Sequence, residues 1–160
     1  MKNPNDLAPI HRAVMTHSLP VVQQALSDGV DIDAVDREGR SALFYAIKDG
    51  ELAIAGELIK HGANVNIQDN NGETPLHFAS REYRPEEAKL LIVNGASSLL
   101  KDSNGNTALW RAVFDSRGRG DVIKVLLSAG ADKKMKNKSG TSPEDLANRI
   151  ANYDLTQFLD

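Results

Sequence analysis

The chain has 160 residues, of which 41% are hydrophobic but only 5% are aromatic, so small aliphatic side chains have to fill most of a core. Its 19 basic and 22 acidic side chains give a net charge of −3, which argues against general nucleic-acid binding because such proteins usually carry a basic face. The absence of cysteine excludes disulfides, thiolate zinc sites and cysteine nucleophiles. No segment has the apolar run of a secretion signal or the roughly 18 apolar residues of a membrane span, so we expect a cytoplasmic protein.

A related segment recurs along the chain at a nearly constant spacing. The copies begin at Ala8 (Ala-Pro-Ile-His), Ser41 (Ser-Ala-Leu-Phe), Thr74 (Thr-Pro-Leu-His) and Thr107 (Thr-Ala-Leu-Trp). An Asp-x-x-Gly turn precedes each of the last three, and the aspartates stand 33 residues apart, at Asp36, Asp69 and Asp102. Asn137 opens a similar turn 35 residues further on. Self-similarity with this period predicts a repeat architecture.

The spacing divides the chain into five predicted units that form one domain over residues 1–160. Their expected bounds are 1–35, 36–68, 69–101, 102–136 and 137–160. The first unit lacks an opening turn and is expected to be the N-terminal cap. The last unit is expected to be the C-terminal cap, with two helices rich in polar residues at 141–147 and 154–160, because end units need a wetted outer face. With both ends capped, we expect a complete, self-standing array.

The third unit illustrates the local structure expected of each one. Asp69 suits a turn because its side chain can accept hydrogen bonds from the following backbone, and Gly72 supplies a positive φ. Thr74 suits a helix N-cap and Pro75 the first helical position. A second helix follows, and Gly95 stands where a left-handed residue ends it. A single helix pair cannot bury its apolar face, so the units are expected to stack.

The segment Thr74-Pro-Leu-His resembles the signature of the ankyrin-repeat family, whose unit is about 33 residues long. The resemblance covers essentially the whole chain. It implies an all-α repeat solenoid of about five ankyrin repeats, helix-turn-helix units joined by β-turn fingers, with capping repeats at both ends. It also implies a protein-binding module in which His11 and His77 tie adjacent turns together. Phe44 and Trp110 stand where the family has histidine, and we expect Phe44 to lie in the core.

Catalytic and metal-binding patterns are missing from the sequence. His17 and His61 fall at expected helix ends without Asp or Glu at ligand spacing, and no nucleophile elbow, phosphate-binding loop or zinc-protease motif occurs. The carboxylate pairs at 86–87 and 144–145 open helices, where the helix dipole favours negative charge. We therefore expect no enzymatic activity, no cofactor and no metal.

The expected partner-binding site is a stripe along the concave surface, made of the exposed side of the first helix in each unit and of the turns. It is rich in aromatic side chains and arginine, the types enriched at interface hot spots. We expect Tyr45, Phe78 and Phe114 to be exposed there. The stripe comprises Arg12, Met15, Arg37, Glu38, Arg40, Tyr45, Lys48, Asp49, Asn70, Asn71, Glu73, Phe78, Arg81, Glu82, Asn104, Asn106, Trp110, Arg111, Phe114 and Asp115.

Two basic features stand near the C-terminal end of this stripe. Residues 115–121 (Asp-Ser-Arg-Gly-Arg-Gly-Asp) form a loop two residues longer than its counterparts, expected to be mobile because of its glycines. Residues 133–138 (Lys-Lys-Met-Lys-Asn-Lys) gather charge on a turn, either as a solvated tip or as a patch that steers an acidic partner. We expect the fourth unit, with the third, to contribute more to binding than the first or fifth.

The expected partner is a protein whose identity the sequence does not give. A small ankyrin chain without cysteine resembles bacterial ankyrin proteins, some of which are immunity factors, and an immunity or inhibitor protein that occludes a toxin is the leading hypothesis. The alternative is a regulatory or adaptor subunit of a cytosolic enzyme. A host-directed effector, a designed binder and, least favoured, a nucleic-acid binder follow. Because no heptad seam offers self-association, we expect a monomer.

Overall fold

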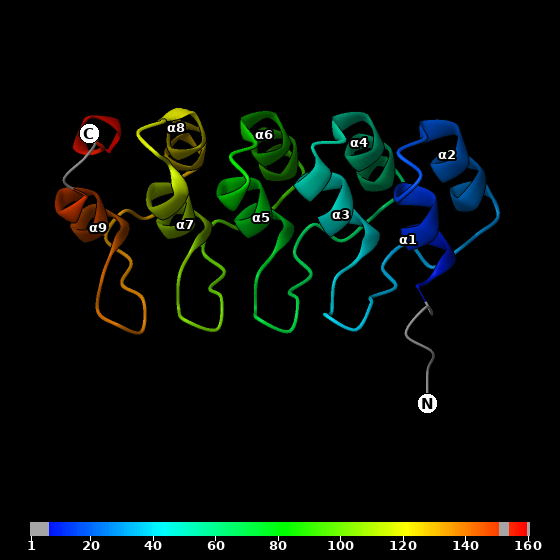
Figure 1. Cartoon of the computed structure of the whole chain (residues 1–160), viewed down its shortest axis with the longest axis horizontal. Helices are drawn as coiled ribbons and strands as arrows, with labels where there is room; N and C mark the ends of the chain where they lie inside the picture. The colour runs from blue at the N-terminus through cyan, green and yellow to red at the C-terminus, as the bar shows by residue number, and fades with distance from the viewer. Residues whose placement is uncertain (1–6, 151–153, 160) are drawn as a thin grey trace.

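Helices follow one another in pairs along a row in the part of the chain that the structure, a computed structural model, describes: residues 7–150 and 154–159 (Figure 1). The helices are α1 (Pro9–Val14), α2 (Leu19–Ser27), α3 (Ala42–Asp49), α4 (Leu52–Lys60), α5 (Pro75–Arg81), α6 (Pro85–Val93), α7 (Ala108–Asp115), α8 (Asp121–Ser128), α9 (Pro143–Arg149) and the 3₁₀ helix η1 (Thr156–Phe158). The expected all-α repeat solenoid is confirmed.

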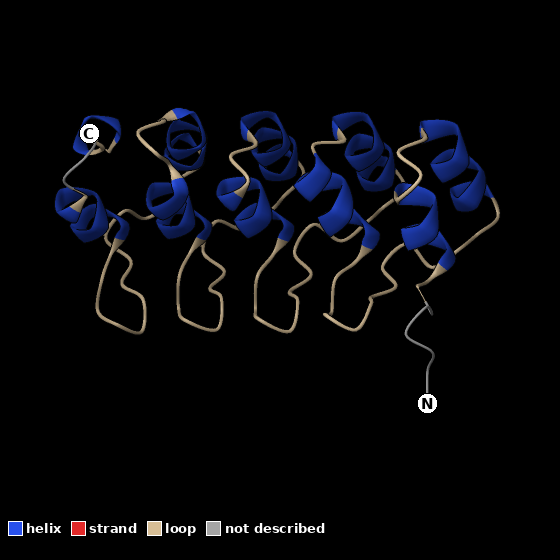
Figure 2. Ribbon diagram, in the orientation of Figure 1, coloured by secondary structure: helices blue, strands red, loops and turns tan. Residues whose placement is uncertain are grey.

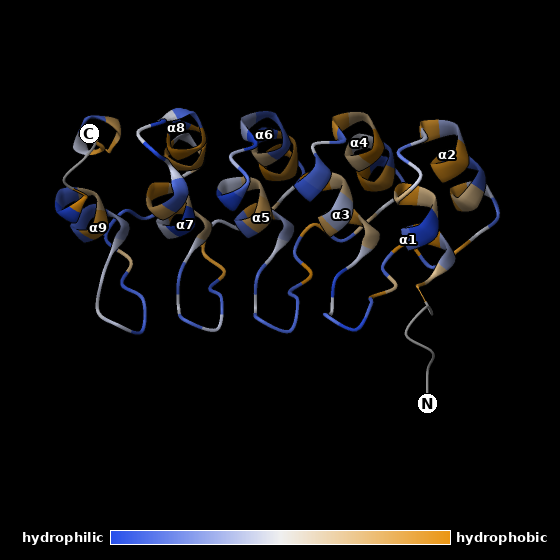
Figure 3. Ribbon diagram, in the orientation of Figure 1, coloured by the Kyte–Doolittle hydropathy of each residue, from blue (hydrophilic) through white to orange (hydrophobic). Residues whose placement is uncertain are grey.

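The odd-numbered helices form an inner row and the even-numbered helices an outer row (Figure 1). Each helix packs against its pair partner and against the equivalent helix of the next pair. Apolar residues concentrate in the two rows, whereas the loops below the inner row are largely hydrophilic (Figure 3). Ala46, Ala79 and Ala112 are fully buried on the inner helices, and their small side chains let neighbouring helices approach closely.

The start and end of the third helix pair follow the sequence expectation. Thr74 caps α5, since its Oγ1 accepts the N–H of His77 at 3.4 Å, and Pro75 occupies the first turn. Gly95 follows the end of α6 with a φ of 89°. This left-handed conformation favours glycine and lets the chain turn back toward the next loop.

The loops between helix pairs project from the inner row as fingers (Figure 2). Each finger from 36–40 to 137–141 contains a hydrogen-bonded turn. In the finger between α4 and α5, Asp69 Oδ1 accepts the N–H groups of Asn71 and Glu73, both at 2.9 Å. Gly72 supplies the positive φ of 73° that the turn needs. Asp36, Asp102 and Asn137 make the same pair of hydrogen bonds in the other fingers.

Neighbouring fingers are also hydrogen-bonded to one another through their backbones. The N–H of Asn70 donates to the Glu38 carbonyl at 2.8 Å, and the N–H of Ser103 donates to that of Asn71 at 2.7 Å. Lys138 repeats the contact at 3.0 Å with the Asn104 carbonyl. The fingers from 36–40 to 137–141 therefore hold one another in a fixed register.

The C-terminal end differs from expectation. A helix over 154–160 was expected, but within the described residues 154–159 only η1 is helical. Such a short segment cannot sustain an α-helix alone, and a single 3₁₀ turn is enough to bury Leu155 and Leu159. Residues 1–6, 151–153 and 160, which the expected caps include, lie outside the described part of the chain.

Candidate protein-binding surface

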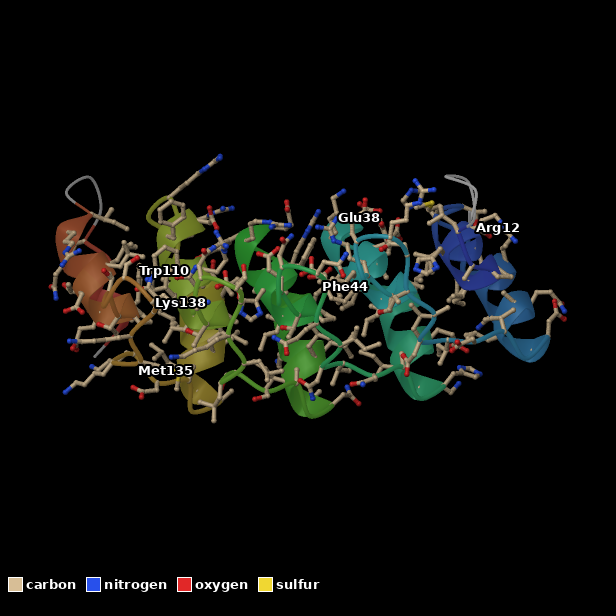
Figure 4. The ribbon with its side chains drawn as sticks, turned by 90° about the horizontal axis from the view of Figure 1, so that it is seen from below. Arg12, Glu38, Phe44, Trp110, Met135 and Lys138 are labelled. Carbon is tan, nitrogen blue, oxygen red and sulfur yellow. The ribbon has the colours of Figure 1, made fainter. Side chains whose placement is uncertain are left out.

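The sequence-predicted stripe lies on the inner helices and fingers, a surface we call the inner face (Figure 4). More than half of its predicted members are exposed, at both ends and in the middle of the row. The exposed members are Arg12, Met15, Arg37, Glu38, Lys48, Asp49, Asn70, Asn71, Glu82, Asn104 and Phe114. Half-buried are Arg40, Tyr45, Arg81, Trp110, Arg111 and Asp115. These side chains are distributed over the inner helices from α1 to α7 and over the fingers between them.

Phe78 corrects the prediction, because its side chain is only 1% exposed. Its ring meets the buried Phe44 ring edge-on, with centroids 5.2 Å apart. The guanidinium groups of Arg40 and Arg81 lie over Phe78, at 5.0 and 4.2 Å from the ring centroid, and shield it from solvent. Phe78 is thus part of the core between α3 and α5, and the expectation that Phe44 lies in the core is confirmed.

Glu73 and Asn106 also differ from the prediction, since both are buried. The carboxylate of Glu73 turns toward Arg81, at 3.1 Å, and toward Arg111, at 3.4 Å. Asn106 donates from its amide to Asp102 Oδ2 at 3.0 Å. Their polar groups are occupied within the protein, so neither residue is an exposed contact.

A chain of charged side chains therefore runs under the middle of the inner face. Arg111 bridges Glu73 and the buried Asp102, with the latter at 3.3 Å. Arg40 similarly reaches Asp69 in the next finger at 3.2 Å. Sequence reasoning missed this network, because its partners lie 29 and 38 residues apart. The only signal in the sequence was that each turn-forming aspartate uses one carboxylate oxygen in its turn and leaves the other oxygen available for a partner.

The half-buried side chain of Tyr45 is fixed by contacts within the protein. Its hydroxyl donates to Asp36 Oδ2, and its ring meets the His11 ring edge-on at 5.9 Å. Burial and the hydrogen bond to Asp36 raise the pKa of Tyr45 to about 12. Burial disfavours the Asp36 carboxylate, but the hydrogen bonds from Tyr45 and from the backbone of Arg40 and Glu38 outweigh it and lower the Asp36 pKa.

The expected tying role of the two signature histidines is confirmed by their contacts. His11 Nε2 lies 2.9 Å from the Arg40 carbonyl, and His77 Nε2 lies 3.1 Å from the Asn106 carbonyl. Each ring thus joins its helix to the finger of the next unit. Burial lowers the pKa of His77, which keeps the ring neutral.

A hollow of about 410 Å³ opens on the inner face between α7 and α9. Trp110 and Phe114 are stacked on its α7 side, with centroids 5.2 Å apart and an interplanar angle of 14°. On its α9 side stand Leu146 and Arg149, which the sequence-predicted stripe did not include. The repeat pattern assigned them to a cap, so no sequence signal marked them as part of a surface.

The long loop between α7 and α8 packs on both neighbouring units. The Arg119 guanidinium lies 3.8 Å from the centroid of the Tyr83 ring, and its Nε donates to the Ser116 carbonyl at 3.1 Å. Gly120 is buried, and a Cβ there would meet the ring of Phe158 at 2.5 Å. Arg117 is exposed. The mobility that the glycines suggested stays a prediction.

Of the four lysines in the cluster at 133–138, one is held by contacts with other residues and three are exposed. Lys133 Nζ donates to the Leu159 carbonyl at 2.6 Å and lies 3.6 Å from Glu144, so it helps to hold the last turn. Lys134, Lys136 and Lys138 are exposed. They extend the basic character of the finger beside the hollow.

Histidine contacts with carboxylates occur away from the inner face. His17 Nδ1 lies 2.8 Å from Glu51, a pairing between successive units that sequence reasoning missed. His61 lies 3.6 Å from Glu57, four residues earlier, which corrects the expectation that it has no carboxylate at ligand spacing. Among the described residues, no group of three or more His, Cys, Asp or Glu side chains is placed to hold a metal ion. The same part of the chain has no helix long and apolar enough to cross a membrane.

The stacked helix pairs and the linked fingers define a helical repeat solenoid. The family model described as "Ankyrin repeats (3 copies)" matches residues 1–69 and 57–137, and the chain belongs to the ankyrin-repeat family. No curated protein matches the chain. Ankyrin repeats typically serve as non-catalytic protein–protein interaction modules, and the repeats of this chain form a protein–protein interaction module.

Proposed function

We propose that this protein is an inhibitor of the immunity type, which binds a toxin through its inner face and covers the toxin's active site. The observation that carries the proposal is the series of exposed side chains from α1 to α7 on a scaffold whose fingers are already hydrogen-bonded to one another. Because the backbone is ordered before the partner arrives, little ordering cost opposes binding. The likeness of a small ankyrin chain without cysteine to bacterial immunity factors supports the toxin as partner.

A growth assay tests this function. The product of the neighbouring reading frame is produced with and without the ankyrin protein, and cells that make this product are expected to survive only when the ankyrin protein is made as well. Survival without the ankyrin protein, or death in its presence, contradicts the immunity role. Purification of the complex followed by mass spectrometry identifies the partner. A metabolic enzyme that remains active in the complex would instead make the chain an adaptor or regulatory subunit.

A matched pair of variants links the result to the inner face. The inner variant is Met15→Ala with Phe114→Ala, and the control is Val21→Ala with Val93→Ala on the outer helices. Met15 and Val21 are nearly equally exposed, at 42% and 43%, and Phe114 and Val93 are exposed as well, so both variants shorten two solvent-facing apolar side chains. Protection is expected to be lost in the inner variant and kept in the outer one. Equal protection by both variants would place the contact elsewhere.

A further inference from the structure

The hollow between α7 and α9 contains an aromatic platform, Trp110 and Phe114, that the described residues leave uncovered. Phe114 is 54% exposed although its ring is stacked on Trp110. Leu146 adds a second apolar wall from α9. The volume of this open hollow is about 410 Å³. One or two side chains of a partner therefore fit into it.

The charged side chains that line the hollow are cationic. Arg111 and Arg149 line the hollow, and no carboxylate lines it. Arg111 is already paired with Glu73 and Asp102 beneath the surface. Arg111 therefore has little capacity left for a carboxylate of a partner, and such a pairing depends on Arg149.

Arg149 is the cation with capacity for a partner. Its side chain is exposed and contacts Thr141 Oγ1 at 3.5 Å, and no described carboxylate lies within 4.0 Å of it. The nearest acidic group on α9, Asp145, accepts the N–H of Ser142 at 3.0 Å as part of the helix cap. The finger that carries the exposed Lys138 borders the hollow beside Trp110, because its backbone is bonded to Asn104 (Figure 4).

We propose that this hollow binds an acidic segment of the partner protein, with an apolar side chain seated on Phe114 and Trp110 and a carboxylate paired with Arg149. The proposal rests on the proposed partner-binding function and assigns the chemistry of one contact. A guanidinium can take a carboxylate in two parallel hydrogen bonds, which fixes the direction of the bound segment. The adjoining aromatic stack supplies buried area at little entropic cost.

A nucleic acid is the less suitable occupant, although bases also stack on aromatic rings. The chain carries a net charge of −3, and one of the two arginines at the hollow is already neutralised by carboxylates. Of the side chains that line the hollow, only the Arg149 guanidinium is a cation with no described carboxylate within 4.0 Å, and one such group matches one or two carboxylates better than a run of phosphates. The two occupants are separated by the test below.

Trp110 is the only tryptophan in the chain, so its fluorescence reports on this hollow alone. The intact protein is titrated with the capped peptide Glu-Asp-Phe-Asp-Glu, with its counterpart Lys-Lys-Phe-Lys-Lys, and with a pentathymidylate of the same charge as the acidic peptide. We expect a saturable change with the acidic peptide only. We expect its affinity to fall at least about tenfold in Arg149→Glu and about fivefold in Phe114→Ala.

Lys60→Glu is the matched control, because Lys60 stands in the last turn of α4 as Arg149 does in α9, but on the outer row. Circular dichroism verifies that each variant is folded. The proposal is overturned if the acidic peptide gives no saturable change, if Lys60→Glu weakens it as much as Arg149→Glu, or if the oligonucleotide binds more tightly. If the growth assay fails while the acidic peptide still binds, only the immunity role is wrong. If Arg149→Glu leaves toxin binding unchanged, only this contact is wrong.

Discussion

Phe78 and Phe114 show how one residue type serves two purposes on equivalent helices. Phe78 lies between α3 and α5 under two guanidinium groups, whereas Phe114 faces solvent on α7. Removing a buried phenylalanine leaves a cavity, so Phe78→Ala is expected to lower the free energy of unfolding by about 3–5 kcal/mol. Phe114→Ala, at the surface, is expected to cost less than about 1 kcal/mol. Urea unfolding measures both, and similar costs for the two variants would contradict the assigned burial.

The buried ring of His77 leads to a prediction about how the stability of the protein depends on pH. Its Nδ1 accepts the Thr74 N–H at 3.2 Å and its Nε2 donates to the Asn106 carbonyl, which requires a neutral ring. Burial lowers the pKa of His77 from its ordinary 6.5, so the unfolded chain binds the proton first as the pH falls. Stability is therefore lost as the pH drops below about 6.5, until the lowered folded pKa is reached.

The measurement compares urea midpoints at pH 7.5 and pH 5.5 for the wild-type protein and for His77→Gln. The other histidines are the same in both proteins. Any difference between the two proteins in how much the urea midpoint falls on acidification therefore arises from His77. We expect a smaller loss of stability on acidification in the variant. An equal loss in both proteins would show that His77 does not carry this pH dependence.

At the scale of elements, the long loop between α7 and α8 connects units that are not adjacent. Arg119 stacks on Tyr83 at the end of α5, and Gly120 packs against Phe158 of η1. The inserted residues thereby join the third helix pair to the C-terminal turn. Shortening the loop is accordingly expected to loosen η1 as well as to alter the surface beside Phe114.

A pair of glycine substitutions tests the packing of this loop. Gly120 has a φ of −107°, which any residue adopts, so Gly120→Ala acts through the contact with Phe158 and through the weaker preference for alanine at the N-cap of α8. Displacing that ring is expected to cost about 1–3 kcal/mol. Gly56→Ala lies within α4 with open space around it and is expected to stabilise by about 0.5–1 kcal/mol. Thermal unfolding measures both, and a neutral Gly120→Ala would mean that the loop is not packed on η1.

At the scale of the whole molecule, the linked fingers and stacked helices make each unit depend on its neighbours. We propose that the units form one cooperative domain, because no helix pair buries its apolar face alone. The urea transition followed by Trp110 fluorescence is then expected to coincide with that followed by far-UV circular dichroism. Two separated transitions would show that the fourth unit unfolds independently.

The sequence predicted the helices and turns but not every side-chain direction. Asp69, Gly72 and Thr74 act through local backbone hydrogen bonds, so their positions in the repeat were enough. The burial of Phe78 depends on Arg40 of the preceding finger, and the hollow depends on Arg149 of the next unit. These are contacts between units, which the period of a repeat does not encode.

The central claim is that the inner face binds the partner protein, and hydrogen exchange of the complex tests it most directly. The toxin or enzyme recovered with the protein is added, and backbone exchange is compared with that of the free chain. We predict slower exchange in the fingers and in α5, α7 and α9, with α2, α4 and α6 unchanged. Protection concentrated on the outer helices, with the fingers exchanging as in the free protein, would contradict the claim.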